Sequence, residues 1–186
     1  MSPFLLRSIE PPLPSAEGRL VNDLHRLGKR VVLELERDLF LVFHLMIAGR
    51  FRWKPKGAPV PGKVGLLALD FDSGTLIMTE AGTKRQASLH VVQGRDALSR
   101  HDPGGLEVLT IDLPTFAAAL RRENHTLKRA LTDPHLFSGI GNAYSDEILH
   151  AARLSPFKQT LGVTDEETSR LFDATRSVLS VWIDRL

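Results

Sequence analysis

The stretch LFSGIGNAYSDEILHAARLSP, residues 136–156, decides how the second half of the chain folds. Gly139 and Gly141 stand directly before Asn142, and the residues that follow favour a helix. Glycine lets a ligand approach the backbone closely, and the free N–H groups at a helix start attract anions. Lys128 lies upstream and adds a positive charge. The pattern predicts a site for one phosphate of a nucleic acid; the alternative is a glycine C-cap followed by a turn and another helix.

Helical patterns continue on both sides of this stretch. Asp112 is typical of a helix start, and Phe116 and Leu120 follow on one face of the expected helix. The last helix is expected to begin at a capping box made by Thr164 and Glu167. Its apolar stripe, which we expect to pack in the core, consists of Leu171, Thr175, Val178, Trp182 and Leu186.

The first half of the chain has the short apolar runs and tight turns of a β-sheet protein. The expected strands are residues 31–36, 39–45, 50–53, 64–71, 75–79 and 87–92. Several short strands with regular turns indicate a sandwich. The break falls in HDPGG, residues 101–105. The sequence therefore predicts an α+β protein, with an antiparallel β-sandwich over residues 1–103 and a helical domain over 104–186.

Bulk composition restricts the class of protein. The chain has 186 residues, of which 42% are apolar and 25% charged, as is typical of a soluble globular protein. The formal net charge is only +2, which is compatible with nucleic-acid binding without requiring it. No apolar run is long enough to span a membrane, and there is no cysteine, so neither disulfides nor cysteine-ligated zinc are expected. We expect a cytoplasmic protein.

The string GIGNAYSDEIL resembles the helix–two-turns–helix motif of the formamidopyrimidine-DNA glycosylase and endonuclease VIII family. Residues 26–53 and 74–92 resemble strands of the same family's first domain. The resemblance implies base-excision repair: removal of an oxidised base, then cleavage of the backbone at the abasic site. It implies a monomer that binds double-stranded DNA containing an oxidised base or an abasic site, in a bacterial cytoplasm and associated with the nucleoid.

The resemblance also assigns roles to individual residues. Lys29 matches a lysine that contacts the phosphate beside the lesion and serves as a proton donor. Lys128 and Asn142 match residues that bind a backbone phosphate, and Gly139 and Gly141 match the glycines of the motif.

Two positions depart from the family pattern, so the sequence leaves open which lesion and which opposite base are preferred. The position of a gap-filling methionine holds Ile47, with Met46 beside it, and either an apolar wedge or a buried strand residue is consistent with the sequence. The position of an arginine–phenylalanine pair holds Lys84 and Arg85, without a following aromatic residue. Lys84 or Arg85 is expected to replace the arginine in DNA binding.

Other polar residues are expected to be structural. His44 and His90 lack companion ligands, so no metal site is predicted. Glu147 matches a family carboxylate that is expected to brace the helix pair. Tyr144 is equally consistent with the core and with a DNA contact.

The family's catalytic nucleophile is the amine of an N-terminal proline followed by glutamate, which forms an imine with the sugar. The chain starts MSPFLL, and the nitrogen of an internal proline is an amide, so this nucleophile is expected to be absent. The family's zinc finger is likewise expected to be missing, and with it any cofactor. Whether the chain is an enzyme is therefore left open by the sequence. The expected function is DNA repair with impaired glycosylase and lyase chemistry; the alternative is a non-catalytic nucleic-acid-binding module.

Overall fold

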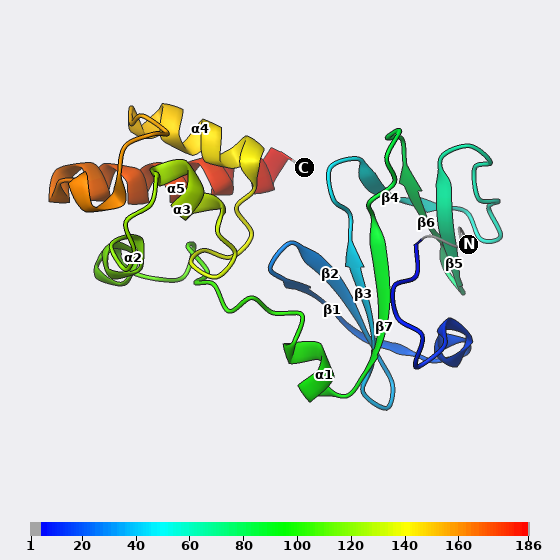
Figure 1. The fold of residues 1–186 in the computed structure, drawn as a ribbon. Helices are drawn as coiled ribbons and strands as arrows, with labels where there is room; N and C mark the ends of the chain where they lie inside the picture. Colours follow the sequence, from blue (N-terminus) through cyan, green and yellow to red (C-terminus); the bar gives the residue numbers. More distant parts are fainter. Residues whose placement is uncertain (1–4, 186) are drawn as a thin grey trace. The chain divides into compact units, whose positions relative to one another are not determined.

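The computed structural model describes residues 5–185 and divides the chain into two compact units, residues 1–101 and 102–186 (Figure 1). The first unit consists mainly of β-strands and the second of helices, which confirms the predicted α+β class. The division falls in the connection where the sequence suggested a boundary. Among the described residues, no helix is both long and apolar enough to cross a membrane.

The first unit contains two antiparallel sheets. The four-stranded sheet has the order β1-β2-β3-β7 and the three-stranded sheet the order β4-β6-β5. The strands are β1 (Val21–Leu27), β2 (Arg30–Leu35), β3 (Leu39–His44), β4 (Gly49–Lys54), β5 (Gly65–Phe71), β6 (Gly74–Glu80) and β7 (Ser88–Gln93). Six of these were expected from the sequence; β1 was not. A short 3-10 turn, Leu13–Ala16, precedes them.

The two sheets enclose a common apolar core, as a sandwich requires. Leu41 and Phe43 of β3 belong to the same buried cluster as Leu67 of β5 and Met78 of β6. The ring of Phe43 meets that of Phe51 edge-on, with centroids 5.2 Å apart. The opposite face of β3 is covered by helix α1 (Arg95–Ser99). Burial on both faces explains why β3 is apolar along most of its length.

The second unit is built from α2 (Leu113–Leu120), α3 (Leu127–Thr132), α4 (Asn142–Ala152) and α5 (Asp165–Arg185), with a 3-10 turn at Thr160–Gly162. Asp112 caps α2 by accepting the Thr115 N–H at 3.0 Å, as predicted. Phe116 and Leu120 are fully buried, and the Phe116 ring stacks on Phe137 with centroids 4.8 Å apart.

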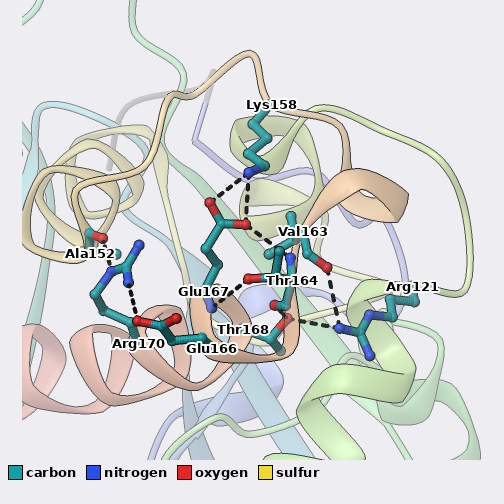
Figure 2. Close-up of polar contacts among 9 residues, drawn as sticks. All are labelled: Arg121, Ala152, Lys158, Val163, Thr164, Glu166, Glu167, Thr168 and Arg170. Carbon is teal, nitrogen blue, oxygen red and sulfur yellow. Dashed lines mark hydrogen bonds and ion pairs between the residues drawn. The ribbon is translucent and has the colours of Figure 1, made fainter.

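The predicted capping box at the start of α5 is present (Figure 2). The Thr164 N–H donates to Glu167 at 2.9 Å, and the Glu167 N–H donates to the Thr164 hydroxyl at 3.2 Å. Lys158 donates to both carboxyl oxygens of Glu167, at 2.6 and 2.7 Å. The pKa of Glu167 is lowered, first by the Lys158 hydrogen bond and then by the Thr164 backbone N–H. These contacts fix the segment before α5 to the helix itself.

The apolar stripe of α5 packs as predicted over its first half. Leu171 and Thr175 are fully buried, and Val178 packs against the same core. Trp182 is only half-buried and meets the ring of Tyr144, 5.8 Å away between centroids. Leu186 lies outside the described residues. Within the described part of α5, the stripe is therefore fully buried at Leu171 and Thr175 and becomes partly exposed further along the helix.

Candidate nucleic-acid interface

The start of α4 has the backbone geometry that the glycines predicted. Gly139 has φ +82°, a value that residues with a Cβ rarely adopt. Gly141 is the N-cap of α4, in an extended conformation. A Cβ added at Gly141 would meet no atom within 4 Å, so the space beside it is open. Because the first N–H groups of a helix have no partner within the helix, the start of α4 can receive an anion.

Lys128 lies at this helix start. Its Nζ is 3.4 Å from the carbonyl oxygen of Asn142 and forms an ion pair with the carboxyl group of Asp146, one turn further along α4. A depression of about 490 Å³ beside Lys128 is bounded by other α3 residues, by Asp146 and by Pro156 and Phe157. The structure therefore brings together Lys128, Asn142 and the glycines, as the sequence suggested.

The backbone around α3 fixes the position of Lys128. Thr126 caps α3, and the N–H groups of Leu127 and Lys128 donate to Lys158 and Pro156 carbonyls at 2.8 and 3.2 Å. The first N–H groups of α3 are thus already used by the chain, whereas no described residue is seen to accept a hydrogen bond from the first N–H groups of α4. Glu167 in turn binds the Lys158 side chain (Figure 2), so the capping box of α5 helps to hold the start of α3, and with it Lys128, in place.

Asp146, and not Glu147, braces the helix pair. Glu147 is exposed and has no side-chain hydrogen bond or ion pair with any described residue, which corrects the expected bracing role. The reason is helical geometry, since consecutive residues point about 100° apart, so only one of the two acids can face α3. The sequence alone does not show which of the two acids faces α3. The packing of α4 against α3 identifies Asp146 as the residue that binds Lys128.

The remaining candidate residues of the first unit lie at one end of the sandwich. Arg30 at the start of β2 pairs with His44 at the end of β3, which pairs with Ser88 at the start of β7. In the other sheet, Gly49 at the start of β4 pairs with Glu80 at the end of β6. Short connections join His44 to Gly49 and Glu80 to Ser88, so these strand ends lie together (Figure 1).

Met46 and Ile47 lie in the turn between β3 and β4, at this end. Met46 has φ +54°, and the side chains of Met46 and Ile47 are 42% and 84% exposed. The alternative of a buried strand residue is therefore wrong. The turn closes tightly because Gly49 donates to the Leu45 carbonyl at 2.9 Å, and a Cβ on Gly49 would lie only 2.3 Å from that oxygen.

Lys84 and Arg85 are exposed in the connection between β6 and β7, residues 81–87. This connection lies against the Met46–Ile47 turn, because a Cβ on Gly82 would stand 3.5 Å from the Cβ of Ala48. Arg85 donates to the carbonyl oxygen of Lys63. The basic pair and the exposed apolar pair are thus neighbours, which the sequence alone did not show.

Lys29 is exposed in the β1–β2 turn, directly after Gly28, whose φ is +60°. The pKa of His44 is lowered by its burial first, and then by the charges of Arg30 and Lys29. Lys29 therefore belongs to the same end of the sandwich as Met46 and Ile47. His90 packs against His101, with ring centroids 4.9 Å apart, in keeping with a structural role.

One group of side chains among the described residues has donors suited to a metal ion: Asp23, His25 and Glu34, on β1 and β2. All three groups already have partners, since Glu34 accepts a hydrogen bond from Arg95 at 2.6 Å and the His25 ring lies 3.4 Å from the Asp23 carboxyl group. We assign this group no role in the interface.

Comparison with known families agrees with both units. The N-terminal domain of formamidopyrimidine-DNA glycosylase matches residues 6–87, and the helix–two-turns–helix domain of the same enzyme matches residues 105–185. The chain belongs to the formamidopyrimidine-DNA glycosylase family. Family membership explains why the phosphate-site pattern and the sandwich occur in one chain.

Individual relatives give the same result. A formamidopyrimidine-DNA glycosylase of Thermus thermophilus is 33% identical over 174 residues, which are 89% of this chain and 60% of that protein. A crystal structure of the enzyme from the same organism superposes with a TM-score of 0.77 at 34% identity, over 91% of this chain and 62% of that one. The structure of the Lactococcus lactis enzyme, bound non-covalently to DNA containing an AP site, superposes with a TM-score of 0.79 at 26% identity. The superposition covers 90% of this chain and 65% of that one. The chain thus spans about 60% of the length of this Thermus relative.

Sequence reasoning missed Glu80. It is the last residue of β6, its exposed fraction is 2%, and it bonds to the connection that carries Lys84 and Arg85. A glutamate at a strand end is ordinarily a surface residue, so its type and position give no sign of this burial.

Proposed function

We propose that this chain binds duplex DNA containing an oxidised base or an abasic site, as part of base-excision repair. The observation that supports this most strongly is the pairing of an open helix start at Gly141 with Lys128, in a chain of this glycosylase family. A solved relative bound to AP-site DNA supports the choice of partner. The helix start and the lysine together offer one backbone phosphate both N–H donors and a positive charge.

For the whole protein we propose DNA glycosylase and abasic-site lyase activity. Lys29 would contact the phosphate beside the lesion and donate a proton, and Met46 or Ile47 would fill the gap left by an extruded base. The exposure of Lys29, Met46 and Ile47 at one end of the sandwich supports these roles. Lys84 and Arg85 would bind the DNA backbone nearby. We infer that the protein acts as a monomer in the bacterial cytoplasm, at the nucleoid.

The binding proposal is tested by measuring the affinity of the 186-residue chain for two duplexes, one intact and one with a tetrahydrofuran abasic-site analogue, over a range of salt concentrations. We expect tighter binding to the analogue. Lys128→Ala should weaken binding to both duplexes and reduce the slope of log K against log salt by about one, because one phosphate contact is lost. An unchanged slope would show that Lys128 does not contact a DNA phosphate.

Two further measurements complete the test. We expect DNA binding to need no metal ion, so adding EDTA should leave the affinities for both duplexes unchanged. Borohydride trapping on an abasic duplex distinguishes an enzyme from the alternative, a non-catalytic binding module. A covalent adduct would identify an amine nucleophile in this chain, and specific binding without an adduct would favour the module.

A further inference from the structure

Glu80 is a buried acid whose carboxyl group accepts hydrogen bonds from the connection that follows it. Its carboxyl group accepts the Gln86 N–H at 2.9 Å and the Ala87 N–H at 3.2 and 3.3 Å. Its own backbone N–H donates to the Val64 carbonyl at 2.8 Å, which holds the residue in the sheet. Burying a carboxyl group is unfavourable unless it is hydrogen-bonded, so Glu80 and these two N–H groups depend on each other.

The position of Glu80 makes it a clamp across the base of the connection formed by residues 81–87. The chain leaves β6 at Glu80, and the same side chain binds the backbone where it enters β7 at Gln86 and Ala87. Between these two points the connection contains Lys84 and Arg85, both exposed. A loop closed at both ends in this way has few conformations available to its tip.

The clamp lies where two connections meet. Glu80 pairs with Gly49, the residue that ends the Met46–Ile47 turn. Gly82, two residues past Glu80, is close enough to Ala48 that an added Cβ would be in contact at 3.5 Å. The side chain that fixes the basic connection therefore also fixes its position against the exposed apolar turn.

We propose that Glu80 is a positioning residue that sets the preference for damaged over intact DNA. It holds Lys84 and Arg85 beside Met46 and Ile47, so that a phosphate contact and an apolar wedge reach the same lesion together. The inference rests on the DNA-binding function proposed above. Glu80 itself is buried and does not touch DNA.

The test compares Glu80→Ala and Glu80→Gln with the parent chain on the intact and abasic-analogue duplexes. We expect Glu80→Ala to reduce the preference for the analogue by about tenfold to a hundredfold, because displacement of a positioned group by about an ångström has effects of this size. Affinity for intact duplex should fall much less, because Lys128 is retained and the charges of Lys84 and Arg85 remain in the chain. Glu80→Gln keeps one acceptor oxygen and places an amide donor near Ala87, so an intermediate loss is expected. Asp70→Asn, the same change from carboxylate to amide on a neighbouring strand, is the control for Glu80→Gln.

Hydrogen exchange provides a second readout that does not depend on DNA. In Glu80→Ala the amides of Gln86 and Ala87 should exchange faster, while exchange in β4 and β5 stays unchanged. Glu80→Gln should retain the fold and show the same change to a smaller degree.

Several outcomes would overturn the proposal. Full preference for the analogue in Glu80→Ala, together with faster exchange, would show that the clamp does not affect lesion choice. If Glu80→Ala weakened binding to both duplexes equally, Glu80 would have a structural role only. A parent chain that binds both duplexes equally would overturn this inference, whereas the Lys128→Ala salt dependence tests the phosphate site separately.

Discussion

Lys128 and Asp146 form an ion pair directly beside the open helix start of α4, and the same lysine lies 3.4 Å from the Asn142 carbonyl. The side chains are 33% and 61% exposed, so the pair adds little to stability. We expect the pair to affect DNA binding more than stability, because the Asp146 carboxylate competes with a DNA phosphate for Lys128. In the absence of DNA, Asp146 offsets the charge of Lys128.

Asp146→Asn should therefore tighten DNA binding. Removing the competing charge should raise affinity for intact duplex by about threefold to tenfold at low salt, and less at high salt, as expected for a surface charge. Anisotropy titrations at two salt concentrations measure this. Glu147→Gln removes the same charge from the neighbouring exposed residue and serves as the control. Equal gains in both variants would mean that only net charge matters.

Gly139 and Gly141 should respond differently to the same substitution. Gly139→Ala forces a Cβ into a backbone with φ +82° and should lower the free energy of unfolding by roughly 1–3 kcal/mol. Gly141→Ala meets no protein atom and should leave stability almost unchanged, but its methyl group would occupy the space that a phosphate approaches. Urea denaturation and duplex titration of both variants check this. Unchanged DNA affinity in Gly141→Ala would place the phosphate elsewhere.

Ile47→Ala tests the apolar wedge. With 84% of the side chain exposed, its removal should not destabilise the fold, yet it should weaken binding to the abasic analogue more than to intact duplex. Leu24→Ala, which removes an apolar side chain 62% exposed on β1, is the control. Equal losses of affinity on the two duplexes would show that Ile47 does not enter the gap.

Much of the fold was predictable, because the patterns that identify it are local. The β2–β3 hairpin, the cap at Asp112 and the capping box at Thr164 each depend on residues close in sequence. β1 was missed because it is an edge strand with mostly exposed residues, so it lacks the apolar alternation that marks a strand.

The site was predictable in its parts but not in its contacts. The glycines and Lys128 carry a local signal, whereas the partner of Lys128 depends on which face of α4 meets α3. The exposure of Met46 depends on the turn that Gly49 closes, and the burial of Glu80 depends on how the following connection folds over it. Such contacts join residues that no short pattern relates.

Stability should fall as the solution becomes mildly acidic. Burial lowers the pKa of His44, His90 and His101, and the nearby charge of Arg30 lowers all three further. The unfolded chain therefore binds protons first, near pH 6.5, so stability is present above that pH and is lost as pH falls toward the lowered values. Thermal unfolding between about pH 8 and pH 5 measures the change. His90→Gln should flatten the profile; a melting temperature independent of pH would contradict the burial of these rings.

The register that pairs Gly49 with Glu80 has a consequence for protein engineering. A one-residue slip between β4 and β6 would exchange the two faces of the strand and separate the connections that start there. We therefore expect residues 45–48 and 81–87 to behave as one unit that can be exchanged between relatives, provided that the lengths of β4 and β6 are kept. Exchanging the two connections together between relatives should transfer a binding preference that neither would transfer alone.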